Sequence, residues 1–141
     1  MVPARYHNAY KQNEISTSSQ GKLILMMYEG AIKFTKMALQ SMDTGDIAGK
    51  AKYIGKIHDI VNELSVSLDL KNGGEVTARL ETLYQFVLRQ LTLANIKSDR
   101  QALESIIKVL EPLHDAWVQI FNNQNTEPQK PQALKSIASK V

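Results

Sequence analysis

The residues best suited to chemistry in this sequence are a glutamate and a histidine three positions apart. Glu111 and His114 form a Glu-x-x-His pair, the spacing used by carboxylate-bridged di-iron bundles. Such a site needs a second pair and two further glutamates, and no second Glu-x-x-His occurs in the sequence. The pair also falls away from the apolar stripe of its segment. We therefore expect no metal site, and a small metal-dependent bundle enzyme is the alternative hypothesis.

Other catalytic patterns are incomplete. His58 stands alone near an apolar stripe, which is typical of a packed or hydrogen-bonded side chain. Ser19 and Lys22 have the Ser-x-x-Lys spacing of some acyl-transfer enzymes, but the accompanying motifs are missing and helix capping accounts for the serine. Gly73-Gly74 lacks the flanking pattern of a phosphate-binding loop and predicts a helix C-terminus. With no cysteine either, we expect no catalytic residues and no cofactor.

Length and composition indicate one domain. The chain has 141 residues, enough to bury a core without a staple, and its lack of cysteine fits a reducing cytoplasm. The net charge is +3 with scattered lysines, a poor signal for nucleic acid. Residues 1–13 are polar, unlike a signal peptide, and the longest apolar run, Leu23–Tyr28, is far too short to span a membrane. We therefore expect a cytoplasmic protein that neither binds nucleic acid nor inserts stably into a membrane.

Turn residues divide the chain into four long helical segments. Hydroxyl residues at 16–19 can cap the first helix, Asp46 the second, and Ser98 with Asp99 the fourth. The helices are predicted over 16–42, 47–70, 76–96 and 99–121. Short connections favour an all-α, antiparallel, up-and-down bundle at 16–121. Residues 1–15 are predicted to be a flexible arm, and the polar tail at 122–141 to be disordered or to form a short helix at 133–138.

Apolar periodicity predicts the core. Three helices each carry one apolar stripe at helical spacing, typical of a bundle. The second helix contributes Ile47, Ala51, Ile54, Ile57, Val61, Leu64 and Leu68; the third Val76, Leu80, Leu83, Val87, Leu91 and Ala94; the fourth Ala102, Ile106, Val109, Leu113, Trp117 and Ile120.

The first helix is apolar around most of its circumference. At 3.6 residues per turn, one narrow arc is formed by Lys22, Glu29, Lys33, Lys36 and Gln40, and mostly apolar residues cover the rest of the circumference. A surface helix needs an apolar stripe only somewhat wider than about 100°. Either this helix is central in the bundle, or part of its surface is free to bind a partner. Binding to a membrane surface through this helix is a further alternative, but it would require the helix to leave the bundle, and the arc offers only three lysines.

Apolar residues beside the core stripes predict a binding groove. Phe86 and Leu93 lie off the main face of the third helix, and an apolar edge runs along the fourth. The simpler interpretation is that these residues only border the buried side of each helix and bind no partner. We predict that a helix from another chain binds this surface. The candidate contacts are Leu23, Met26, Met27, Phe86, Leu93, Leu103, Ile107 and Val118, together with Tyr6, Tyr10 and Ile15 of the arm.

Three stretches of sequence resemble one known family, the flagellar secretion chaperone FliS. They are Ala9–Tyr10 with Ile15–Thr17 and Lys22–Ile32; Asn72–Glu75 leading into Leu80–Tyr84; and Arg89–Leu91 with Ala94–Asn95, Asp99 and Trp117. Together they cover nearly the whole chain up to Phe121. The resemblance implies a non-enzymatic helical bundle with a mobile N-terminal arm. It also implies a client, the C-terminal region of flagellin, which the chaperone keeps from polymerising prematurely and brings to the flagellar export gate.

The sequence departs from the family at one place. The family usually has a proline in the first turn of the first helix, and this chain has Gln20. Because proline at that position only presets the backbone, we expect the change to cost a little helix-start stability and no function.

Overall fold

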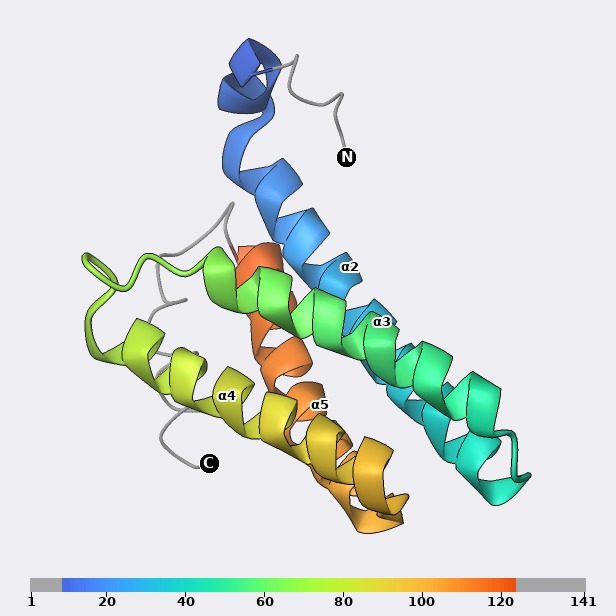
Figure 1. Cartoon of the computed structure of the whole chain (residues 1–141). Coiled ribbons are helices and arrows are strands. Elements are labelled where there is room, and N and C mark those ends of the chain that lie inside the picture. The colour runs from blue at the N-terminus through green and yellow to red at the C-terminus, as the bar shows by residue number, and fades with distance from the viewer. Residues whose placement is uncertain (1–8, 124–141) are drawn as a thin grey trace.

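Four long helices make up the described part of this computed structural model, residues 9–123, with side chains described from Ser19 onward. They are α2 (Ala9–Asp43), α3 (Ile47–Val66), α4 (Gly74–Lys97) and α5 (Arg100–Asn123). Each connection reverses the chain, so that successive helices run antiparallel (Figure 1). The predicted all-α, up-and-down bundle is confirmed. The parts of the predicted arm and tail at 1–8 and 124–141 lie outside the described residues.

The helices pack in a ring, and none of them is central. α2 packs against α3 and α5, and α4 packs against the same two helices. Within the described residues, no backbone contact joins α2 to α4 or α3 to α5. Because α2 is a member of the ring, part of its apolar circumference faces outward. Leu23 and Met26 are 56% and 58% exposed.

The core follows the predicted stripes of α4 and α5 closely. An apolar residue every three or four positions keeps one side of each helix turned inward. Of the stripe residues on these two helices, Val76 and Trp117 are half-buried and pack against the core. The others are buried, namely Leu80, Leu83, Val87, Leu91 and Ala94 on α4, and Ala102, Ile106, Val109, Leu113 and Ile120 on α5.

The first turns of α3 differ from the prediction. Ile54, Ile57, Val61 and Leu64 are buried as expected, but Ile47 is 76% exposed and Ala51 is also exposed. Lys50 turns inward instead, and only 8% of its surface remains exposed. Its ammonium donates hydrogen bonds to the carbonyl of Asn95 at 3.2 Å and to Ser98 Oγ at 2.8 Å. Lys50 therefore brings a positive charge to the C-terminal end of α4, where the helix dipole favours one.

α2 begins earlier than predicted. We expected the first helix to start at a hydroxyl residue between 16 and 19, but it starts at Ala9. Serine and threonine cap helices, yet they also fit inside them when the hydroxyl bonds to a carbonyl of the preceding turn or to water. Gln20 is therefore an interior residue of α2, where a proline would remove a helical hydrogen bond. The expected effect of Gln20 on helix-start stability is thus wrong, because the start lies elsewhere.

Two predicted caps are confirmed. Asp46 Oδ1 accepts a hydrogen bond from the Gly49 N–H at 2.9 Å. Asp99 Oδ1 accepts from the N–H groups of Gln101 at 3.0 Å and Ala102 at 3.3 Å. Each aspartate satisfies backbone donors that the first turn of its helix leaves free. These caps fix the reversals that place α3 beside α2 and α5 beside α4.

α3 ends at Val66, four residues before the predicted end. The Ser67 hydroxyl donates to the Leu64 carbonyl at 2.8 Å, which competes with the helical hydrogen bond of that carbonyl. Asp69 then organises a turn by accepting from the N–H of Asn72 at 3.2 Å through its side chain. Leu68, predicted as a core residue of this helix, lies in the connection and packs half-buried against the core.

A polar contact lies in the middle of the core. The hydroxyls of Tyr28 on α2 and Tyr84 on α4 are 2.5 Å apart, and both side chains are buried. Burial raises the pKa of Tyr28 to about 12, although the hydrogen bond with Tyr84 partly opposes the rise. Burial also raises the pKa of Tyr84, and the nearby Tyr28 adds to the effect. Both hydroxyls therefore stay neutral and can share one hydrogen bond.

Candidate binding surfaces

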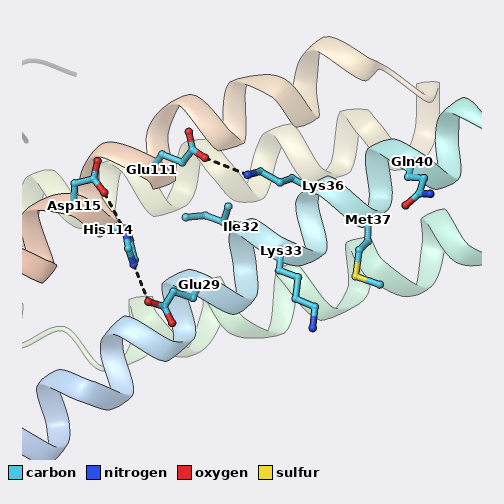
Figure 2. Close-up of a pocket in the computed structure, with 9 residues that line it drawn as sticks. All are labelled: Glu29, Ile32, Lys33, Lys36, Met37, Gln40, Glu111, His114 and Asp115. Carbon is cyan, nitrogen blue, oxygen red and sulfur yellow. Dashed lines mark hydrogen bonds and ion pairs between the residues drawn. The ribbon is translucent and has the colours of Figure 1, made fainter.

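A groove of about 700 Å³ runs between α2 and α5 (Figure 2). Its sides carry charged residues, and Ile32 lies between them as an apolar part of the lining. The antiparallel packing of α2 and α5 places residues 29–40 of one helix opposite residues 111–115 of the other. The lining residues are Glu29, Ile32, Lys33, Lys36, Met37, Gln40, Glu111, His114 and Asp115.

Charge pairs cross the boundary between α2 and α5 at three levels. His114 Nε2 lies 3.0 Å from Glu29 Oε2, and Lys36 Nζ lies 3.5 Å from Glu111 Oε2. Further along, Arg100 makes two hydrogen bonds of 2.9 Å to Asp43. Most of these side chains are solvent-exposed, so each pair contributes little to stability. Together they fix the register of the two helices along their shared edge.

Two opposing effects act on the pKa of His114. Partial burial by itself would lower the pKa of His114. The hydrogen bonds and negative charges of Glu29 and Asp115 outweigh that effect and raise the pKa above its ordinary value. The His114 ring therefore lies between a carboxylate on each helix, because its Nδ1 also lies 3.3 Å from Asp115 Oδ1.

The residues that first pointed to chemistry do not form a catalytic centre in the described structure. Glu111 and His114 line the same groove but pair with different residues, Lys36 and Glu29. Among residues 19–123, no group of three or more histidine, aspartate or glutamate side chains is placed to hold a metal ion. Ser19, Lys22 and His58 are exposed. No helix of the described part is long and apolar enough to cross a membrane.

Exposed apolar side chains gather at the two ends of the bundle. Leu23 and Met26 lie on the part of α2 that precedes Gly30, which packs beside Ile60, so they are near the end of α3 that carries Val66 and is followed by Leu70. At the opposite end, Ile47 begins α3, and the hydrogen bond from Lys50 to Asn95 places that end beside the end of α4 that carries Leu93 and Ile96. The prediction from sequence included Leu23, Met26 and Leu93. It missed Val66, Leu70 and Ile96, and it assigned Ile47 to the core.

The remaining residues predicted to bind the client differ in how deeply they are buried. Met27 and Phe86 are half-buried and pack against the core, and Ile107 and Val118 are also half-buried. Leu103 was predicted to lie on an apolar edge open to a partner, and this prediction is wrong because the side chain is fully buried. It lies about 20° around α5 from the buried Leu110, within the inward side of the helix. Tyr6 lies outside the described residues, as do the side chains of Tyr10 and Ile15.

The structure does not bring the predicted contacts into one groove. Ile107 and Val118 flank His114 on the side of α5 that faces α2. Phe86 lies about 140° around α4 from Glu81, whose carboxylate accepts a hydrogen bond from Ser65 of α3. Phe86 therefore lies on the side of α4 away from α3, and Leu93 is two turns further along the same side. These pairs belong to different edges of the bundle.

The described residues form a well-packed all-α bundle that leaves large apolar side chains exposed, Leu23 and Met26 among them. The family model described as flagellar protein FliS matches residues 2–124, and the chain belongs to that family.

The sequence is similar to those of curated relatives over most of their length. The flagellar secretion chaperone FliS of Campylobacter jejuni is 34% identical over 118 residues, covering 84% of this chain and 92% of the relative. The Vibrio cholerae chaperone of the same name is 34% identical over 116 residues, covering 79% and 85%. The Bacillus subtilis one is 31% identical over 121 residues, covering 86% and 90%. The family is one of chaperones, so the expectation of a non-enzymatic protein is confirmed.

Proposed function

We propose that this chain is a cytoplasmic export chaperone that binds the C-terminal region of flagellin. It prevents premature polymerisation of flagellin and delivers it to the flagellar type III export apparatus. The observation that carries this proposal is the family match over residues 2–124. Relatives that cover most of this chain are named flagellar secretion chaperones, which supports the same role. Docking at the export gate is part of the proposal.

The exposed apolar side chains of α2 give the client a surface. Leu23 and Met26 are three positions apart, so they lie on the same side of the helix within one turn. Both are large and more than half exposed, which is costly in water unless a partner covers them. Methionine adapts to partners of different shape because its side chain is unbranched and flexible. An amphipathic client helix can bury this pair together with the half-buried Met27.

The client would be an extended chain segment that folds as it binds. Exposed apolar residues lie at both ends of the bundle, and the half-buried ones lie on separate edges. A single helix cannot cover these positions at once, but several short helices joined by flexible links can. Burial of apolar surface in such a process gives a negative heat-capacity change. Because the exposed contacts are apolar, added salt should weaken the complex only slightly.

The N-terminal arm has two possible roles in this proposal. Tyr6, Tyr10 and Ile15 can cover the apolar surface of the free chaperone, or they can contact the client directly. Changing all three to alanine distinguishes the roles. A covering arm predicts tighter client binding and a more aggregation-prone free protein, whereas a contacting arm predicts weaker binding. Unchanged affinity and unchanged solubility would exclude both roles.

Calorimetry with purified flagellin tests the proposal. Full-length flagellin should bind, and flagellin lacking its C-terminal region should not. The variant Leu23→Gln/Met26→Gln should bind more weakly by about tenfold or more, because an interface anchor contributes at least about 1–2 kcal/mol. Lys22→Gln is the matched control on the same exposed turn and should leave affinity unchanged. Equal binding of the truncated and full-length flagellins would contradict the proposal.

A further inference from the structure

The outer faces of α2 and α3 carry three lysines gathered over two aromatic rings. Phe34 of α2 and Tyr53 of α3 stack with centroids 5.9 Å apart and planes inclined by 18°. The ammonium groups of Lys33 and Lys56 lie 5.9 and 5.6 Å from the Phe34 centroid. The ammonium of Lys52 lies 5.3 Å from the Tyr53 centroid. We call these five residues the lysine–aromatic patch.

The rings hold the lysines in place. Phe34 and Tyr53 are half-buried and pack against the core, so their positions are fixed by the bundle. A cation over an aromatic face is attracted by the electron density of the ring. The lysine stems also gain apolar contact while their ammonium groups remain in water. The three cations are therefore gathered on one surface before any partner arrives.

These charges are not neutralised within the described part of the chain. None of the three lysines is within ion-pair distance of a described carboxylate, in contrast to Lys36, which pairs with Glu111. Asp59 lies one turn from Lys56 on α3 and forms no ion pair with it. Lys33 also lines the groove between α2 and α5, and Figure 2 shows its side chain directed away from Glu111 and His114. The patch thus presents three available cations.

We propose that the lysine–aromatic patch binds an acidic segment of a partner protein. Carboxylates of such a segment would pair with the three ammonium groups, and its apolar groups would contact the exposed edges of the rings. The patch carries none of the exposed large apolar residues assigned to the client. The proposal is therefore independent of the proposed function, and both surfaces can be occupied at once.

The chemistry of the patch favours an acidic protein segment over other anionic partners. Proteins bind an anionic membrane surface through inserted apolar side chains or through clusters of about four or more cations, whereas the patch has three lysines and exposes no large apolar side chain freely. Affinity for nucleic acid comes largely from the number of phosphates that are neutralised, and the patch supplies only three cations. Three carboxylates spaced along one peptide match its charge and size.

Nuclear magnetic resonance with an acidic peptide tests this proposal. A peptide of alternating glutamate and alanine is titrated into the isotope-labelled full chain, with a glutamine–alanine peptide as the neutral control. Shifts should cluster at residues 33–34 and 52–56, and the neutral peptide should produce none. The variant Lys33→Gln/Lys52→Gln/Lys56→Gln should lose about tenfold in affinity, the order expected for three exposed ion pairs.

A charge-matched variant separates a specific patch from general attraction. Lys71, Lys97 and Lys108 are exposed and lie elsewhere on the bundle, so their triple change to glutamine alters the net charge equally. This control should bind the acidic peptide as the original chain does. Equal losses in the two variants, or shifts spread over all lysines, would overturn the proposal. Sedimentation with vesicles of phosphatidylserine and phosphatidylcholine is the last arm, and lysine-dependent vesicle binding without peptide binding would also overturn it.

Discussion

The Tyr28 and Tyr84 hydroxyls meet at 2.5 Å although their helices share no backbone contact. The two rings are tilted by 54° with centroids 6.5 Å apart, so the contact reaches across the ring of helices from α2 to α4. Each hydroxyl is buried and needs a partner, because an unpaired polar group in the core costs free energy. The pair therefore specifies how α2 faces α4 more sharply than apolar packing would.

Removing both of these hydroxyls should cost less than the sum of the two single removals. Tyr28→Phe leaves the Tyr84 hydroxyl buried without this partner, and we expect a loss of about 1–3 kcal/mol in the free energy of unfolding. In Tyr28→Phe/Tyr84→Phe both polar groups are gone, so the loss should be smaller than the sum of the single losses. Urea denaturation of the original chain, Tyr28→Phe, Tyr84→Phe and the double variant measures the coupling. Additive losses would show that the hydrogen bond contributes nothing to stability.

The same pair should make the bundle sensitive to alkaline pH. The pKa of Tyr28 is about 12 in the folded protein, whereas an unfolded tyrosine titrates near about 10. Below about pH 10 both states keep the proton, so stability is at its full value. As pH rises from about 10 through 12, the unfolded state loses its proton first and stability falls. Urea midpoints across this range should fall less steeply in the double phenylalanine variant.

His114 should give a second pH dependence near neutrality. Its pKa is raised in the folded state, so its contribution is fully present below the unfolded value of about 6.5. The contribution is lost as pH rises through the folded pKa. Glu29→Gln removes one of the two carboxylates that hold the imidazolium, so the difference in urea midpoint between pH 5 and pH 8 should shrink. An unchanged difference would show that Glu29 has no such effect.

Lys50 should stabilise the bundle despite being a buried charge. Lys50→Met keeps much of the side-chain length but removes the donor to Asn95 and Ser98, and we expect a loss of about 1.5–3 kcal/mol. Thermal unfolding of the variant measures this loss. Lys71→Met is the control, because Lys71 is exposed in the α3–α4 connection and its change should have little effect. A variant as stable as the original would mean that desolvation of the ammonium offsets its hydrogen bonds.

The sequence predicts the core well where apolar periodicity alone decides which residues are buried. The stripes of α4 and α5 are long and regular, so residues such as Leu83 and Leu113 were assigned to the core correctly. On α3, apolar periodicity assigns Ala51 rather than Lys50 to the core, because it ranks residues by polarity. It cannot anticipate that the carbonyl of Asn95, distant in sequence, will pair the ammonium. The true orientation of α3 depends on that tertiary contact.

The candidate binding residues were harder to place for a related reason. A helical repeat gives the angle of a residue around its own helix, but not which neighbouring helix lies on that side. Phe86 and Ile107 both lie beside a core stripe, yet the structure puts them on different edges. The lysine–aromatic patch was not predicted, because it combines residues of two helices. Stacking of Phe34 on Tyr53 is a property of the packed pair.

Gly21 links the first part of α2 to the end of α5. A Cβ placed on Gly21 would lie 2.8 Å from Cδ1 of Phe121, closer than two carbons can approach. Glycine is otherwise unfavourable inside a helix, by about 1 kcal/mol relative to alanine. The absence of a side chain at residue 21 therefore allows the Phe121 ring to approach the α2 backbone closely. This contact positions the α5 end beside the part of α2 that carries Leu23 and Met26.

The final prediction tests whether the close approach of Phe121 cancels the stability that alanine would otherwise add to the helix at residue 21. Gly55 lies inside α3 with no atom within 4 Å of its would-be Cβ, so Gly55→Ala should stabilise the bundle by about 1 kcal/mol. Gly21→Ala should not show that gain, because the Phe121 ring must move from its contact. When Phe121→Ala is already present, the obstacle is gone and Gly21→Ala should stabilise as Gly55→Ala does. Urea denaturation of the resulting double-mutant cycle measures the coupling between residues 21 and 121. If Gly21→Ala gives the full gain with Phe121 intact, the ring does not depend on the glycine, and the end of α5 is free to shift along α2.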